Sequence, residues 1–172
     1  GCWESRQELI DRKEIERALA QAGVKLITAH DNLAALIEAI GGIPPDLIIL
    51  GEDLDPKVFD FIRDIRHNKL GNNPFVLITT LVAPSHVDAA KWALQSGTDD
   101  VIVRPVKDDQ LMQRLRRVVL HRQAFVVTSD YLGPDRRGRN RPSKIRRINV
   151  LNTMLEKASG RDIDEAKVRA AV

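Results

Sequence analysis

Acidic side chains and an arginine follow two of the most apolar segments of this sequence. The segment GED at 51–53 comes directly after the apolar run 47–50, and Arg104 follows the shorter run 101–103. Carboxylates at the end of a strand can loosely hold a cation, and a planar guanidinium is suited to pairing with carboxylates. Solvated acids on the rim of a sheet are the simpler interpretation of the first group.

A second group of charged residues lies in the C-terminal third of the chain. Seven basic residues fall between positions 134 and 147, and only Asp135 opposes them. Residues 123–172 hold 11 Lys/Arg and 6 Asp/Glu, a net of +5, whereas residues 1–122 hold 16 and 18, a net of −2. Such a split predicts that the tail has a separate role.

Most other catalytic and metal-binding patterns are missing from the sequence. The four histidines are scattered, with no cysteine or carboxylate at ligand spacing, and there is no phosphate loop or nucleophile elbow. A single cysteine excludes an internal disulfide framework and suits a reducing cytoplasm. The apolar runs are far shorter than a membrane span. We therefore expect a cytoplasmic protein without metal, cofactor or catalysis.

Helical and strand-like segments alternate along the first 120 residues. Helices are predicted at 10–22, 32–40, 55–66, 85–95 and from 108 or 109 onward, and strands at 24–29, 47–50, 75–79 and 101–103. Beyond His121, an edge strand at 125–128 precedes the basic loop, and two weaker helices follow at 150–158 and 162–171. Strands that alternate with crossover helices predict an α/β fold whose parallel sheet is covered on both faces.

Three of these segments resemble the receiver domain of bacterial two-component response regulators, the CheY-like or flavodoxin-like doubly wound fold. They are PDLIIL at 45–50, PFVLITT at 74–80 and SGTDDVIVRP at 96–105, and their order and spacing agree with the family. The resemblance implies the strand order 2-1-3-4-5 and a crevice at the carboxyl ends of the strands. We expect a receiver-like domain at 1–122, with its first strand barely present, and a basic, irregular or helical extension at 123–172.

The resemblance also implies where a phosphoacceptor site should lie. In active receivers an acidic pair after the first strand and an aspartate after the third hold Mg²⁺. A threonine or serine after the fourth strand and a lysine after the fifth contact the phosphoryl group. Mapped residue by residue, these positions fall on Glu4, Gly51, Thr79 with Thr80 beside it, and Arg104.

Almost every reacting part of that site is altered. Gly51 has no side chain and cannot be phosphorylated, and Glu52 or Asp53 would be displaced substitutes for the acceptor. Arg104 could face solvent, or it could pair with Glu4, Glu52 or Asp53 and replace the phosphoryl contact permanently. The sequence therefore predicts a degenerate receiver, or pseudo-receiver.

The basic tail carries the segment YLGPDRR at 131–137, which is similar to a C-terminal segment of other receiver-like chains. Its arginines could dock a protein, with a tyrosine as anchor, or bind cyclic di-GMP or another phosphate ligand. Nucleic acid is a weaker alternative because aromatic residues make up only 4% of the chain and no helix-turn-helix is recognisable. A solvated arm is the remaining interpretation. The residues concerned are Tyr131, Arg136, Arg137, Arg139 and Arg141.

Together these features predict a phosphorylation-independent signalling adaptor or regulatory binding module. The resemblance implies protein partners, and homodimerisation, through the face formed by helix 4, strand 5 and helix 5, which here includes Trp92, Val101 and Val103. The alternatives are a phosphate-ligand binder acting through the tail and a phosphoacceptor regulator using Glu52 or Asp53. Nucleic-acid binding is the least favoured.

Overall fold

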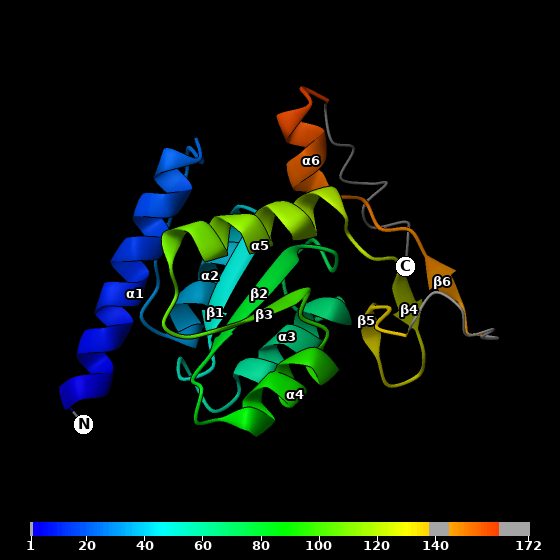
Figure 1. The fold of residues 1–172 in the computed structure, drawn as a ribbon. Helices are drawn as coiled ribbons and strands as arrows, with labels where there is room; N and C mark the ends of the chain where they lie inside the picture. Colours follow the sequence, from blue (N-terminus) through cyan, green and yellow to red (C-terminus); the bar gives the residue numbers. More distant parts are fainter. Residues whose placement is uncertain (1, 138–144, 162–172) are drawn as a thin grey trace.

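A three-stranded parallel sheet forms the centre of the molecule. The computed structural model describes residues 2–137 and 145–161, with side chains described from residue 11 on. The strands are β1 (Leu47–Gly51), β2 (Leu77–Val82) and β3 (Asp100–Val103), in the order β1-β2-β3 (Figure 1). All six residues of β2 are buried, as expected of a strand with a neighbour on each side and helices on both faces.

Helices cover both faces of this sheet (Figure 1). On one face, α1 (Cys2–Gln21) and α5 (Asp108–Leu120) pack around Leu81 and Ile102. On the other lie α2 (Leu33–Gly42), α3 (Val58–Arg66) and α4 (Val87–Ser96). In α3 the buried residues recur at helical spacing and pack against Ile48 and Leu50. The predicted α/β class and CheY-like arrangement are confirmed.

Local signals explain some of the helix boundaries. Asn32 caps α2, because its side-chain oxygen accepts a hydrogen bond of 2.9 Å from the Ala35 N–H. Gly97 ends α4 in the left-handed region, at φ 98°. The helix predicted from residue 85 begins at Val87 instead, after His86, whose side chain makes no capping hydrogen bond.

Two strand predictions need correction. The strand predicted at 24–29 does not form, and Leu26 within it is 69% exposed. In the order 2-1-3-4-5 the second strand of the fold pairs only with the first strand. The residues from Cys2 to Gln21, which precede the segment 24–29, are helical, so no first strand is present for that segment to pair with. The strand predicted at 75–79 instead occupies 77–82. The observed sheet thus contains the third, fourth and fifth strands of the expected order.

The C-terminal residues form a second, antiparallel sheet beside the body of the protein (Figure 1). Its strands are β4 (Phe125–Val127), β5 (Leu132–Pro134) and β6 (Arg147–Ile148), in the order β5-β4-β6. Helix α6 (Thr153–Ala158) follows, shorter than predicted, and the helix predicted at 162–171 lies outside the described residues. The sequence predicted only β4.

A buried ionic cluster joins the second sheet to the body. The guanidinium of Arg66 is fully buried and donates to the carbonyls of Gly97, Pro74 and Val76, and to Asp99 at 2.8 Å. Burial lowers the pKa of Arg66 to about 10, which leaves it cationic at neutral pH. Arg122 shares Asp99 at 3.2 Å.

The ring of Phe125 in β4 also takes part in this contact between the second sheet and the body. Both guanidinium groups of the cluster lie over it, at 5.1 and 5.0 Å from its centroid. Cation–π contacts of this kind strengthen when they are desolvated. Strand β4 is therefore held against the body by charge as well as by apolar packing.

Candidate functional site

Arg104 occupies the carboxyl end of the parallel sheet, between two carboxylates. It follows β3, and its two terminal nitrogens donate to Asp53 at 2.6 and 2.9 Å in a bidentate fork. Its Nε lies 3.5 Å from Asp11 Oδ2. The Arg104 side chain is 14% exposed and that of Asp11 only 2%. Arg104 therefore does not face solvent, and Asp53, one of the three partners that the sequence suggested, is paired with it.

Asp11 was not among the site residues predicted from the sequence. The acidic residue was expected at Glu4, whose side chain lies outside the described part of the chain. Asp11 stands four residues before Ile15 and eight before Leu19, both of which belong to the apolar cluster on this face of the sheet. A charged residue on the apolar stripe of a helix was the available signal, because positions i, i+4 and i+8 share one face.

Gly51 leaves the space that this ion pair needs. A Cβ built on Gly51 would overlap Asp53 Oδ1 and would lie 2.6 Å from an Arg104 terminal nitrogen. The residue at the expected acceptor position therefore supplies no nucleophile. The Arg104–Asp53 ion pair occupies the space that a side chain at this position would need.

Glu52 bonds to the far side of the strand end. Its Oε1 accepts a hydrogen bond of 2.6 Å from the backbone N–H of Ala83 and lies 3.0 Å from His86 Nδ1. The Glu52 side chain is 6% exposed. Its carboxylate therefore fixes the end of β1 to the loop that leads into α4.

The two threonines expected to supply the hydroxyl ligand lie inside β2 and not after its end. Because β2 continues to Val82, Thr79 and Thr80 are internal to the strand, paired with Ile49 and Leu50 of β1. The Thr80 hydroxyl bonds to that of Thr98 at 3.0 Å, and the Thr79 hydroxyl is buried with no hydrogen-bond partner among the described residues. The expectation that Thr79 ends the fourth strand is wrong, since Val82 and Ala83 stand there.

The donor set does not fit the Mg²⁺ ion that active receivers hold. A divalent cation needs several carboxylate or carbonyl oxygens that can converge on it. Here Asp11 and Asp53 both face the Arg104 guanidinium, and Glu52 is bonded to Ala83. Within residues 11–137 and 145–161, no three His, Cys, Asp or Glu side chains gather as a metal site would require. The positive charge at this crevice is supplied by the chain.

The tail residues singled out from the sequence lie at the other end of β3. Tyr131 donates its hydroxyl to the Pro134 carbonyl at 3.2 Å, and burial raises the pKa of Tyr131. Arg136 donates to the Thr98 carbonyl. Arg137 pairs with Asp135 at 2.9 Å and holds the pKa of that carboxyl below its usual range.

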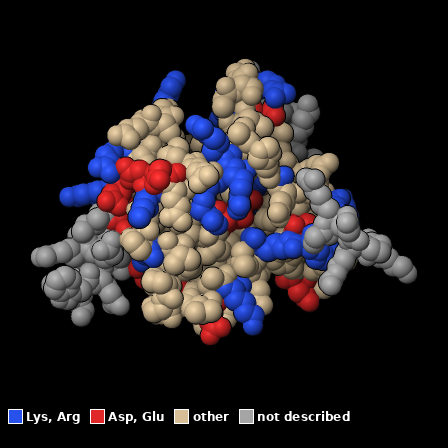
Figure 2. All heavy atoms as spheres, in the orientation of Figure 1, with Lys and Arg blue, Asp and Glu red and all other residues tan. Residues whose placement is uncertain are grey.

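Each of these three tail residues thus makes contacts within the chain. The remaining two, Arg139 and Arg141, lie outside the described residues. Figure 2 shows further basic side chains gathered over α5. The roles predicted for the tail in ligand or partner binding stay predictions.

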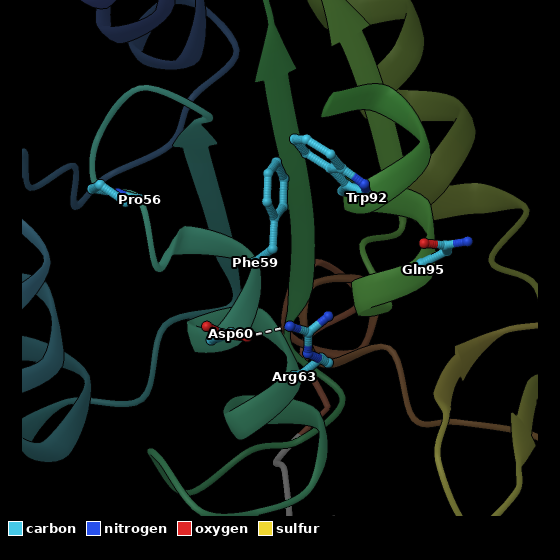
Figure 3. Close-up of a pocket in the computed structure, with 6 residues that line it drawn as sticks. All are labelled: Pro56, Phe59, Asp60, Arg63, Trp92 and Gln95. Atoms are coloured by element: carbon cyan, nitrogen blue, oxygen red, sulfur yellow. Dashed lines mark hydrogen bonds and ion pairs between the residues drawn. The ribbon is translucent and has the colours of Figure 1, made fainter. Parts of the chain in front are cut away.

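A shallow hollow of about 250 Å³ lies between α3 and α4 (Figure 3). Phe59 and Trp92 meet edge to face across it, with centroids 6.2 Å apart, and Trp92 is 51% exposed. The other lining residues are Pro56, Asp60, Arg63 and Gln95. None of the phosphoacceptor-site residues lines this hollow. Trp92 therefore packs on the neighbouring helix α3.

Comparison with known proteins agrees with this geometry. The chain is 30% identical over 115 residues to the transcriptional regulatory protein PrrA of Mycobacterium leprae, which covers 67% of this chain and 48% of that protein. It is 31% identical over 114 residues to the regulator of RpoS of Escherichia coli, covering 65% and 31%. The chain therefore spans about half or less of the length of these relatives. No protein-family model matches.

A solved structure shows the same fold. It is the signal receiver domain of a response regulator from Bermanella marisrubri, matched at a TM-score of 0.53 and 26% identity over 66% of this chain and 92% of that one. The sheet, the helices on both faces and these similarities define a CheY-like receiver domain, the domain class of two-component response regulators. No helix in the described part of the chain is long and apolar enough to cross a membrane.

Proposed function

We propose that this chain is a phosphorylation-independent signalling adaptor or regulatory binding module built on a receiver domain. The observation that carries the proposal is the Arg104 fork on Asp53, which lies over Gly51 where an acceptor side chain would stand. A site that already contains a closed ion pair, and lacks the nucleophile, has no vacancy for a transferred phosphoryl group.

The two substitute acceptors are also engaged. The Glu52 carboxylate is almost fully buried and bonded to Ala83, and both oxygens of Asp53 accept from Arg104. In-line attack on a phosphoryl donor requires a free, correctly placed oxygen. This arrangement disfavours a phosphoacceptor regulator that uses either residue, and it supports a module without catalysis of its own.

The surface that would meet a partner is the one formed by α4, β3 and α5. Val103 is 48% exposed, and Arg114 and Arg117 pair with Asp100 on this face. Trp92, which the sequence assigned to the same face, instead lies on the α3 side of α4, against Phe59. Arginine side chains are enriched among the residues that dominate protein interfaces. We therefore propose that protein partners, including a second copy of the chain, dock on this face and not on the arginine-rich tail.

A nuclease-treated pull-down at physiological salt tests the proposal. We expect the intact chain to capture the same proteins with and without acetyl phosphate and Mg²⁺, and to lose them on Val103→Ser with Arg117→Ala. A matched variant in which Arg136, Arg137, Arg139 and Arg141 are alanine should keep them. Partners that depend on acetyl phosphate would contradict the proposal, and partners lost only with the arginines would move docking to the tail.

The phosphate-ligand alternative is checked separately. Arg136 and Arg137 are occupied by Thr98 and Asp135, so we expect no heat when cyclic di-GMP is titrated into the whole chain. Binding that is abolished by Arg136→Ala with Arg137→Ala would restore that function.

A further inference from the structure

The hollow between α3 and α4 brings side chains of two helices together at the surface (Figure 3). On α3, Arg63 follows Asp60 by three residues and Phe59 by four. On α4, Gln95 follows Trp92 by three residues. Residues at these spacings share one face of a helix, so each helix presents a continuous stripe to the hollow.

The apolar part of the hollow is an aromatic pair that is left partly in water. Trp92 is 51% exposed, although its ring meets that of Phe59 edge to face with centroids 6.2 Å apart. Accessible aromatic surface at a concave place, with a few polar groups beside it, is typical of a binding site. An occupant of this hollow would therefore offer apolar surface to the two rings.

The charges that line the hollow cancel. Asp60 and Arg63 form an ion pair with each other, so the lining carries no net charge. A nucleotide or an acidic peptide would need a cation that is free to pair with it, and a basic peptide would need a free carboxylate. The charge of the hollow is therefore complementary to an uncharged segment.

The other polar groups of the hollow can donate hydrogen bonds. Within residues 11–137 and 145–161, neither the indole N–H of Trp92 nor the side-chain amide of Gln95 makes a hydrogen bond to the protein. An indole nitrogen only donates, and a glutamine amide group donates twice. A matching ligand presents carbonyl oxygens and few N–H groups. Proline has this property, because it keeps its carbonyl and lacks the N–H.

The dimensions of the hollow suit a short stretch of polyproline II helix. From Phe59 to Arg63 the helix α3 rises about 6 Å, at about 1.5 Å per residue. Two residues of polyproline II helix cover the same length, at about 3.1 Å each. The volume of about 250 Å³ likewise limits the occupant to a few side chains. A polyproline II segment has no internal hydrogen bonds, so its carbonyls are available to donors on the protein.

We propose that the hollow between α3 and α4 binds an extended, proline-rich segment of a partner protein. Two consecutive prolines pack on Trp92 and Phe59, and their carbonyls accept hydrogen bonds from the Trp92 indole and the Gln95 amide. Such a segment is stiff before it binds and loses little conformational entropy. The inference depends neither on phosphate acceptance by the receiver nor on docking at the face formed by α4, β3 and α5.

Fluorescence anisotropy with the whole chain tests the proposal. The probe is a hexaproline peptide that carries fluorescein, and its control is a glycine–serine peptide of the same length with the same label. We expect the chain to bind hexaproline with a Kd below about 1 mM and not to bind the control. Absence of hexaproline binding up to about 1 mM, or equal binding of both peptides, would overturn the proposal.

Substitutions in the hollow test which groups hold the peptide. Trp92→Phe keeps an aromatic ring and removes the donor, and Gln95→Ala removes an exposed donor. Each should weaken hexaproline binding about 3- to 10-fold, because one hydrogen bond is lost. Val87→Ser is the matched control on the same helix: Val87 is 80% exposed and lies outside the hollow, so the Kd should stay within about twofold.

Two results with these variants would contradict the proposal. One is an affinity that neither Trp92→Phe nor Gln95→Ala changes, and the other is an equal loss in Val87→Ser. If Trp92→Phe fails to fold, Gln95→Ala decides the question alone, because its side chain is exposed.

NMR then locates the peptide on the chain. The indole N–H resonance of Trp92, identified by its absence in Trp92→Phe, should move when unlabelled hexaproline is added, while the Val103 amide should not. An indole resonance that stays in place would overturn the proposal. Movement that follows protein concentration without peptide, together with a doubled mass, would assign the hollow to a second copy and contradict the proposal.

Discussion

At the scale of single residues, the crevice is organised around Arg104. A lysine at this position would present one point charge, whereas the guanidinium reaches Asp53 with two donors and Asp11 with a third nitrogen. Planar, bidentate pairs are the stronger class of ion pair. The Asp53 carboxylate, which follows β1, is therefore neutralised by Arg104, which follows β3.

Replacing Arg104 by lysine tests that geometry. Arg104→Lys keeps the charge and loses the fork, so we expect the free energy of unfolding to fall by about 1–2 kcal/mol in a urea titration. Arg63→Lys is the matched control, because Arg63 pairs with Asp60 on an exposed helix surface and should change stability by less than about 0.5 kcal/mol. Equal effects of both variants would show that the Arg104 fork is not specific.

The buried hydroxyl of Thr79 supports a prediction of opposite sign. It lacks a hydrogen-bond partner in the described residues, so Thr79→Val should raise the free energy of unfolding by about 1 kcal/mol. Thr80→Val is its control in the same strand and should lower it by about 1 kcal/mol, because the bond to Thr98 is lost. Destabilisation by Thr79→Val would mean that this hydroxyl has a partner in solution.

At the scale of secondary-structure elements, the YLGPDRR segment forms a tight attachment point. Gly133 in β5 has no room for a side chain: a Cβ there would lie 2.6 Å from the Tyr131 hydroxyl and 2.8 Å from the Gly97 Cα. The left-handed turn that ends α4 thus packs directly on β5. Residues 132–134 of this segment therefore form a short strand that contacts the body.

We expect Gly133→Ala to loosen this contact. Overpacking against Tyr131 and Gly97 should lower the free energy of unfolding by about 2 kcal/mol, measured by urea denaturation. Gly42→Ala is the control, since a Cβ at Gly42 meets nothing within 4 Å, and it should leave stability unchanged or raise it by about 0.5 kcal/mol. A neutral Gly133→Ala would show that β5 is not pressed against the end of α4.

Helices and strands were predicted correctly where the hydrophobic pattern of the segment agreed with the neighbouring elements available to it. The apolar run 47–50 and the helical stripe of α3 needed only local patterns, and both formed as expected. The segment 24–29 has strand-forming residues but no partner strand, so its pattern alone could not decide its structure. At the site, Gly51 and Arg104 were found from their places after strands, whereas Asp11 required knowledge of how α1 packs.

At the scale of the whole molecule, the two regions of interest lie at opposite ends of β3. The Arg104 cluster follows this strand, whereas Thr98 and Asp99, which contact Arg136 and Arg66, precede it. The basic segment therefore attaches to the body at the end away from the crevice. A change at one end would reach the other only through β3 and the helices that flank it.

Intact-mass measurement after incubation with acetyl phosphate and Mg²⁺ tests the central claim most directly. We predict an unchanged mass for the whole chain, because Gly51 offers no acceptor and the carboxylates of Glu52 and Asp53 are already engaged. A phosphorylatable response-regulator receiver measured in parallel establishes that the donor is active. A gain of one phosphoryl group, mapped to Glu52 or Asp53, would contradict phosphorylation independence and restore a working receiver.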